Sequence, residues 1–142
     1  MPYREPGPAL DAVYPAQPTR VAEIRRDVAN IAAIFGADET ALLRITLAVS
    51  EAATNAILHA YRGTAVEGDV RVLVSHANEF LDVSIRDAGV GMSPRTDSPG
   101  LGLGLGLMAH EAYQCEIKSS PTGGTEVVLR FELPPRLSSS GR

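Results

Sequence analysis

The sequence predicts an α+β fold in which two helices pack on one face of an antiparallel or mixed sheet. Residues 19–36 and 38–61 repeat apolar side chains at the three- and four-residue spacing of amphipathic helices. Residues 69–87 and 115–133 alternate apolar and polar side chains as half-buried strands do. Helices that precede the strand pairs in this order favour a helix layer on a sheet.

The N-terminal segment is rich in proline up to Pro18, so only a short strand around Leu10 to Tyr14 is expected there. Thr19 is the expected N-cap of the first helix, and Gly36 stands where a glycine commonly ends one. Asp38 is the expected N-cap of a second, longer helix that ends near Tyr61. The expected buried stripes are Val21, Ile24, Val28, Ile31 and Phe35 in the first helix, and Leu42, Ile45, Val49, Ala52, Ala56 and Ala60 in the second.

Two hairpins follow the helices. The first alternates Val70, Val72 and Val74, then Leu81, Val83 and Ile85, joined by the polar stretch SHANE. Residues 87–106 form a loop of about twenty residues, a length that a compact domain rarely keeps without a functional reason. A short helix over Leu105 to Tyr113 and a second hairpin that turns at Pro121 to Gly124 complete the expected elements.

Composition excludes several classes of protein. The chain has 142 residues, 44% of them hydrophobic, which suits one compact domain. A net charge of −4 without a Lys or Arg block disfavours direct nucleic-acid binding. One cysteine, Cys115, and a start without a signal-peptide pattern predict a cytoplasmic protein. The apolar runs are shorter than the ~20 residues that cross a bilayer, so we expect no membrane segment.

Three polar interruptions of this apolar frame carry the chemistry. In VSEAATNAILHAY, Glu51, Asn55 and His59 recur every four residues and so lie along one edge of the helix, beside its buried stripe. The plain interpretation is a solvated helix shoulder. Asp87 ends a strand and precedes Gly89 and Gly91, which forms either a turn or a ligand site. In the second case Asp87 accepts a hydrogen bond from a ligand amino group and the glycines let a flat ring approach the backbone.

The third interruption is SPGLGLGLGLMAH, with glycine at every second position before an apolar helix start. Consecutive backbone N–H groups before a helix can cradle phosphates. A low-complexity linker is the alternative, but the regular leucines argue against it. The sequence lacks the Walker A motif, the H-R-D and D-F-G motifs of eukaryotic-type protein kinases, metal-ligand spacings and G-x-S-x-G.

Together, E-x-x-x-N-A-x-x-H-A-Y, D-x-G-x-G and G-x-G-x-G-L-M resemble the Bergerat-type (GHKL) ATP-binding fold of gyrase, heat-shock ATPase chaperones and histidine kinases. The segment SEAATNAILHAY and the C-terminal segment GGTEVVLRFEL are most similar to those of the bacterial anti-sigma factor serine/threonine kinases. The resemblance implies a two-layer α/β sandwich with a mixed, mostly antiparallel sheet and helices on one face. It places the histidine kinase-like ATP-binding domain at 10–133, between flexible termini at 1–9 and 134–142.

The resemblance also implies the roles of individual residues toward ATP and Mg²⁺. Glu51 would be the catalytic general base, Asn55 would bind the Mg²⁺ that bridges the phosphates, and Asp87 would recognise the adenine amino group. His59 is either structural or directly involved, and Arg62 or Arg95 would touch the terminal phosphate. The remaining implied nucleotide contacts are Gly89, Gly91 and Met92 near the base and Gly102, Leu103, Gly104, Leu105 and Gly106 in the lid, with Gly100 as the alternative to Gly106.

The implied function is that of an ATP-dependent serine/threonine kinase and anti-sigma factor. Such a protein phosphorylates a serine or threonine of an anti-anti-sigma (STAS-type) protein, sequesters a sigma factor and forms homodimers. A non-catalytic, ATP-binding regulatory module for partner switching is the alternative. The catalytic domain of a two-component histidine kinase is disfavoured, because only a Pro-rich stretch precedes the first helix where a dimerisation helix pair is needed.

Overall fold

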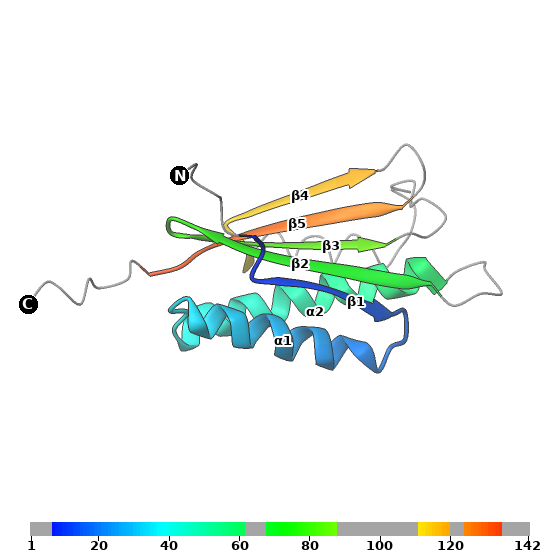
Figure 1. Ribbon diagram of the computed structural model, residues 1–142, viewed down its shortest axis with the longest axis horizontal. Helices are drawn as coiled ribbons and strands as arrows, with labels where there is room; N and C mark the ends of the chain where they lie inside the picture. The colour runs from blue at the N-terminus through cyan, green and yellow to red at the C-terminus, as the bar shows by residue number, and fades with distance from the viewer. Residues whose placement is uncertain (1–6, 62–67, 88–110, 120–123, 135–142) are drawn as a thin grey trace, which may run out of the picture.

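A five-stranded sheet and two helices form the two layers of the fold (Figure 1). The computed structural model describes residues 7–61, 68–87, 111–119 and 124–134, without the side chains of 59–61. The elements are β1 (Leu10–Pro15), α1 (Arg20–Ile34), α2 (Glu39–Tyr61), β2 (Asp69–Ala77), β3 (Phe80–Asp87), β4 (Gln114–Ser119) and β5 (Thr125–Glu132). The strand order is β1-β2-β3-β5-β4, and all four pairings are antiparallel. The predicted fold class is confirmed, with an antiparallel rather than a mixed sheet among the described strands.

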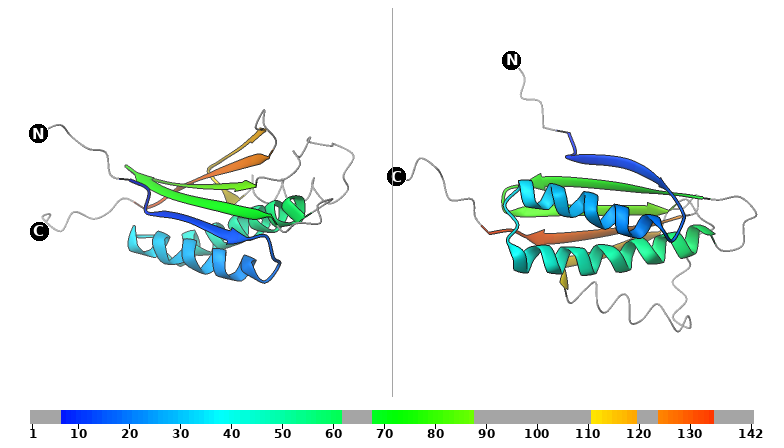
Figure 2. Two further views of the ribbon diagram at one scale, coloured as in Figure 1. Left: turned by 45° about the vertical axis from the view of Figure 1, so that its right-hand side comes forward. Right: turned by 90° about the horizontal axis from the view of Figure 1, so that it is seen from below.

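Both helices cover the same face of the sheet (Figure 2). α1 packs on β1 and β2, and α2 packs on β2, β3 and β5. Alternate residues of the central strands supply the core: Val70, Val72, Val74, Leu81, Val83, Ile85 and Leu129 are at most 1% exposed. On the helix side the core contains Ile24, Val28, Ala32, Ile45, Ala48, Val49, Ala52, Ala53, Ala56 and Ile57. The other sheet face is left open by the described helices.

The three residues predicted to begin or end the helices lie at those positions. Gly36 has φ +96° directly after α1, a conformation that glycine adopts without strain. Asp38 caps α2, because its Oδ1 accepts a hydrogen bond of 2.8 Å from the N–H of Ala41. Thr19 is the N-cap residue of α1, as predicted, but its side chain makes no capping hydrogen bond. Its backbone is already helical, with φ −65° and ψ −18°, whereas a capping side chain needs an extended backbone.

The β2–β3 hairpin is tighter than the sequence indicated. The strands remain paired up to Ala77 and Phe80, so the polar stretch SHANE belongs mostly to β2. Asn78, with φ 58°, lies in the left-handed region that asparagine tolerates better than most residues. Most of the expected helix at Leu105 to Tyr113, most of the Pro121 to Gly124 turn and most of both expected flexible termini lie outside the described residues.

The sequence analysis expected no segment long and apolar enough to cross a membrane, but α2 meets that criterion. By length and composition alone, Glu39–Leu58 would suffice to cross a membrane. Its apolar side chains have a different explanation in this fold, because one side of α2 is buried against the sheet. Leu43, Leu47 and Leu58 remain exposed on its other side.

Candidate nucleotide-binding site

The C-terminal half of α2, the end of β3 and the start of β5 meet at one end of the sheet (Figures 1 and 2). Asp87 is the last residue of β3 and pairs in register with Thr125, the first residue of β5. Directly opposed residues share a face of the sheet. Asp87 also pairs with the fully buried Val70, so both side chains belong to the face that carries the helices.

Asp87 and Thr125 are the only buried polar residues in the described part of the chain, with 8% and 4% exposure. A buried carboxylate is costly unless other groups hydrogen-bond to it. The Thr125 hydroxyl is buried as well, and it lacks a hydrogen-bond partner among the described residues. The sequence analysis did not identify Thr125 as a site residue. Pairing the strand that begins in GGTEVV with the end of the preceding hairpin would have placed Thr125 opposite Asp87.

Asn55 lies on α2, and its Nδ2 is the other buried side-chain atom without a partner in the described residues. An unsatisfied buried polar group costs about 1–3 kcal/mol. In native proteins such a group calls for an explanation, and a ligand, an ion or an ordered water that completes its hydrogen bonding is one. The amide of Asn55 and the hydroxyl of Thr125 are therefore the groups that a bound polar molecule would satisfy.

Glu51 precedes Asn55 by one helical turn and is partly buried. The neighbouring hydroxyls are engaged with the helix backbone: Ser50 donates to the carbonyl of Thr46 at 2.6 Å, and Thr54 donates to the carbonyl of Ser50 at 2.7 Å. Glu51 and Asn55 are both partly buried and lie beside the buried stripe, as the sequence predicted. The side chain of His59 lies outside the description.

The rest of the predicted site lies in residues 62–67 and 88–110, outside the described residues. These predictions therefore stay untested: Gly89, Gly91, Met92, Gly100, Gly102, Leu103, Gly104, Leu105 and Gly106 for the nucleotide, and Arg62 and Arg95 for the terminal phosphate. Of the predicted site residues, the structure describes Glu51, Asn55 and Asp87. It brings Asp87 to the same end of the sheet as the half of α2 that carries the other two.

The side chains at this end of the sheet can be compared with what a Mg²⁺ site requires. No group of three or more His, Cys, Asp or Glu side chains gathers into a metal site among the described residues. Mg²⁺ does not require one, because it keeps several waters and is often bound by one or two protein oxygens together with substrate phosphates. The Asn55 amide has an oxygen of the kind that Mg²⁺ takes as a ligand, whereas its buried Nδ2 is a donor that a ligand oxygen would satisfy.

Comparison with known proteins agrees with this arrangement. The family model of the histidine kinase-like ATPase domain matches residues 14–131. The anti-sigma F factor of Bacillus licheniformis is 34% identical over 103 residues, which cover 65% of this chain and 70% of that protein. The serine-protein kinase RsbW of Bacillus licheniformis is 29% identical over 133 residues, covering 84% of this chain and 82% of that protein.

Solved structures show the same fold. The RsbU and RsbW domains of Rv1364c from Mycobacterium tuberculosis superpose with a TM-score of 0.69 at 22% identity, covering 96% of this chain and 35% of that one. The histidine kinase domain of Erythrobacter litoralis EL346 gives a TM-score of 0.58 at 26% identity, covering 84% and 61%. The family match spans most of the chain and includes Glu51, Asn55, Asp87 and Thr125. The chain therefore belongs to the histidine kinase-like (GHKL) ATPase domain family, among the anti-sigma factor kinases.

Proposed function

We propose that this chain is an ATP-dependent serine/threonine protein kinase that acts as an anti-sigma factor. The observation that carries the proposal is the buried Asp87–Thr125 pair at the end of the sheet to which α2 brings Glu51 and Asn55. The names of the relatives, an anti-sigma F factor and a serine-protein kinase, support the same role.

Asp87 and Thr125 suit the recognition of adenine. The exocyclic amino group of adenine is a donor, and a buried carboxylate is an acceptor, so Asp87 can accept its hydrogen bond. The Thr125 hydroxyl can donate to a ring nitrogen or to a bridging water. Guanine presents a carbonyl oxygen where adenine has the amino group, and that oxygen would face the Asp87 carboxylate without a proton between them. The pair therefore favours adenine over guanine.

Glu51 and Asn55 suit the transfer step. In phosphoryl transfer the protein mainly positions the reactants and stabilises charge. Glu51 would accept the proton of the acceptor serine or threonine hydroxyl. The hydroxyl oxygen would form a bond to the γ-phosphorus while the bond between the γ-phosphorus and the β,γ-bridging oxygen breaks. Mg²⁺ would neutralise phosphate charge when bound, with Asn55 as a ligand. The remaining contacts would come from Gly89, Gly91 and Met92 near the base and from the lid residues Gly102 to Gly106.

The partners follow from the same assignment. We propose a sigma factor as the protein that is held, and a serine or threonine of an anti-anti-sigma (STAS-type) protein as the phosphate acceptor. A homodimer in the cytoplasm is the proposed state. The non-catalytic alternative, a module in which ATP only sets partner affinity, differs in one measurable respect, since it transfers no phosphate.

The test is incubation of the full chain with γ-labelled ATP, Mg²⁺ and candidate STAS-type proteins. We expect labelled serine or threonine on the partner, and we expect Glu51→Ala to abolish labelling while ATP affinity changes less than about threefold. Glu39→Gln is the matched control, because Glu39 is an exposed acid in the first turn of the same helix. Normal ATP binding without transfer by the unaltered chain would favour the regulatory module. Loss of ATP binding in a folded Glu51→Ala variant would contradict the proposed role of Glu51.

A further inference from the structure

The open face of the sheet carries a row of side chains that the proposed kinase function does not use. Strand pairing places one residue of each strand in this row: Val13, Arg71, Arg86, Glu126 and Lys118. Arg71 and Arg86 are direct cross-strand neighbours on β2 and β3. Like charges in this position are destabilising, so the pair calls for an explanation beyond solubility.

Each arginine is paired with an acid on its outer side only. Asp11 on β1 accepts hydrogen bonds from Nε and Nη2 of Arg71 at 2.9 and 2.8 Å. Glu126 on β5 accepts one from Nε of Arg86 at 2.6 Å, and Ser84 also donates to this carboxylate. In contacts among the described residues, Nη1 of Arg71 and both terminal nitrogens of Arg86 make no hydrogen bond. Donors on the two guanidinium groups therefore remain available between the two acids.

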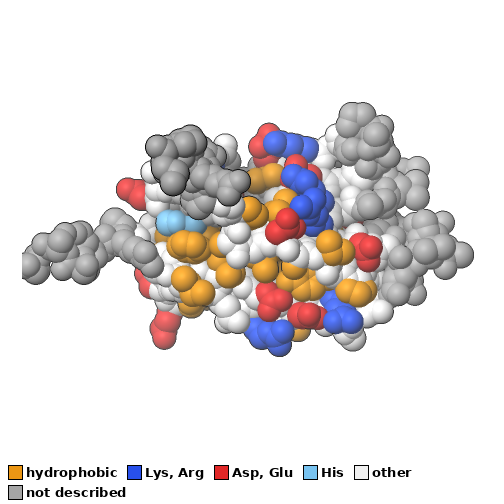
Figure 3. All heavy atoms as spheres, viewed as in Figure 1, with side chains coloured by type: hydrophobic (Ala, Val, Ile, Leu, Met, Phe, Trp, Pro, Cys, Tyr) orange, Lys and Arg blue, Asp and Glu red, His pale blue; other side chains and the backbone are white. Residues whose placement is uncertain are grey.

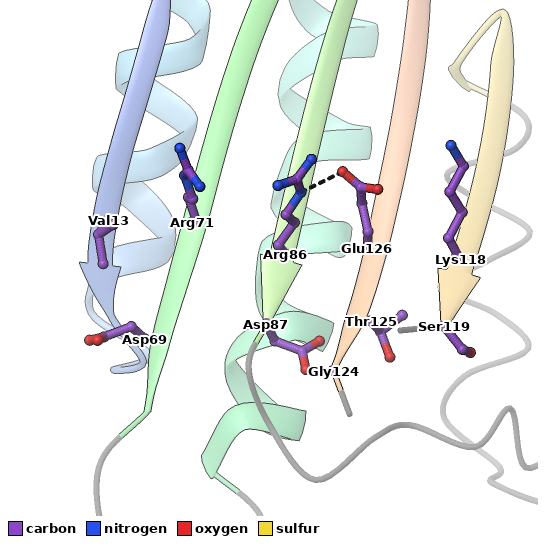
Figure 4. A pocket seen from close by; sticks show the side chains of 10 residues that line it. All are labelled: Val13, Asp69, Arg71, Arg86, Asp87, Lys118, Ser119, Gly124, Thr125 and Glu126. Atoms are coloured by element: carbon purple, nitrogen blue, oxygen red, sulfur yellow. Dashed lines mark hydrogen bonds and ion pairs between the residues drawn. The ribbon is translucent and has the colours of Figure 1, made fainter. Parts of the chain in front are cut away.

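A pocket of 630 Å³ opens over this row (Figure 4). Arg71, Arg86 and Lys118 line it together with Asp69 and Glu126. The only acid within ion-pair distance of Lys118 in the described residues is Glu116, whose Oε2 lies 3.9 Å from the Lys118 Nζ. Basic and acidic side chains also gather over the strands in the space-filling view (Figure 3). Asp87 and Thr125 contribute to the pocket rim, although their side chains belong to the helix-covered face.

We propose that this pocket binds an oxyanion of the phosphate type between Arg71 and Arg86, with Lys118 on its β4 side. Guanidinium groups match the oxygen spacing of phosphate, and hydrogen bonds between two charged groups are stronger than neutral ones. A bound dianion also relieves the repulsion between the two arginines. The ligand is either free phosphate or a phosphoryl group on another molecule.

Arg130 is the built-in comparison on the same open face. Asp82 accepts two hydrogen bonds from it, at 2.8 and 3.0 Å, in the same bidentate geometry that joins Asp11 to Arg71. Its guanidinium also lies over the Phe80 ring, 5.0 Å from the centroid. Its cross-strand neighbours are Asp82 and Gln114 rather than a second arginine, and it lies outside the pocket. Removing its charge changes the net charge equally and leaves the pocket intact.

The experiment is an NMR titration of the full, isotope-labelled chain with inorganic phosphate at constant ionic strength, observed at the arginine Nε–H groups and the amides of β2 and β3. We expect saturable shifts centred on Arg71 and Arg86. Arg71→Gln and Arg86→Gln should each weaken binding about tenfold, the effect of one lost charge-assisted hydrogen bond. Arg130→Gln should leave the affinity unchanged, and Asp11→Asn should tighten binding because it removes the competing carboxylate.

Further arms separate the sources and the sites. A phosphoserine peptide that binds tighter than inorganic phosphate, with the same arginine dependence, would identify a phosphoryl group on a partner; equal affinity would identify free phosphate. Arg71→Gln and Arg86→Gln should leave ATP affinity unchanged, so failure of this proposal and failure of the nucleotide proposal are measured separately. Chemical shifts that do not saturate would overturn the proposal, and so would an equal loss of phosphate affinity in Arg130→Gln. It would also be overturned if the arginine substitutions changed only the dimer mass measured by sedimentation and not phosphate binding.

Discussion

Asn55 on α2 and Thr125 on β5 each bury a side-chain polar atom that has no hydrogen-bond partner in the described residues, and they are the only two that do. The elements that carry them converge at one end of the sheet (Figure 1). Buried unsatisfied groups lower stability, so their concentration at one end indicates that binding, not folding, explains them.

This relationship predicts opposite effects of Thr125→Val on stability and on binding. Valine matches the shape of threonine without the hydroxyl, so the chain should unfold with the same free energy or up to about 1 kcal/mol more. ATP affinity should fall, because the hydroxyl no longer donates to the ligand. Urea unfolding and calorimetry measure the two quantities. Thr46→Val is the control, since the Thr46 hydroxyl donates to the carbonyl of Leu43 within α2. Weaker folding together with unchanged ATP affinity would contradict the binding role.

Asp87→Asn should weaken ATP binding by tenfold or more, because the amide presents a donor as readily as an acceptor to the adenine amino group. The preference for ATP over GTP should shrink in parallel. Calorimetry with Mg²⁺ and both nucleotides measures this. Asp82→Asn is the matched control, as Asp82 lies on the same strand but pairs with Arg130 on the open face. Equal ATP affinity of the unaltered chain and Asp87→Asn would remove the basis of the site.

The sequence predicts those features of the fold and the site that depend on local signals, and it misses those that depend on strand pairing. Local signals were sufficient for the helices, because Gly36 and Asp38 mark their ends through nearby backbone geometry. They also placed Asp87 at the end of a strand, as the structure has it, while its role toward a nucleotide stays a prediction. Thr125 was not recognised because its burial depends on pairing with β3, 38 residues away, and the Arg71–Arg86 neighbourhood likewise depends on strand register. The position of Thr19 was predicted, but the absence of its capping hydrogen bond was not, because that depends on the helical backbone of Thr19 itself.

Tyr14→Phe should loosen the contact between β1 and α1. The Tyr14 hydroxyl is in a buried residue and donates to Oδ2 of Asp27 at 2.8 Å. Its loss should cost about 1 kcal/mol. Burial, and secondarily the hydrogen bond to Asp27, raises the pKa of Tyr14 well above its ordinary value of 10.0. The folded state therefore holds this proton more tightly than the unfolded state does.

That linkage gives the phenylalanine variant a pH signature. The contribution of Tyr14 to stability is fully present below pH 10 and is lost as the pH rises from there toward its folded-state pKa. Unfolding measured at pH 7 and again above pH 10 should show a smaller alkaline decline in Tyr14→Phe than in the unaltered chain. Tyr113→Phe is the control, because Tyr113 is 63% exposed. An identical alkaline decline in all three proteins would show that the Tyr14–Asp27 bond is not responsible.

Ala52 is the position where packing and the proposed catalysis are coupled most directly. Ala48, Ala52 and Ala53 are fully buried, and their small side chains set how closely α2 approaches the sheet. Ala52→Leu should therefore lower the free energy of unfolding by about 1–3 kcal/mol through overpacking. It should also displace Glu51 and Asn55, and misplacement by about 1 Å can reduce a positioned reaction about a hundredfold. We expect phosphate transfer to fall more than ATP affinity, measured with labelled ATP and by calorimetry at a temperature where the variant is folded. Ala22→Leu on the exposed side of α1 is the control. An Ala52→Leu variant with unaltered stability and unaltered phosphate transfer would contradict the proposed coupling between α2 packing and catalysis.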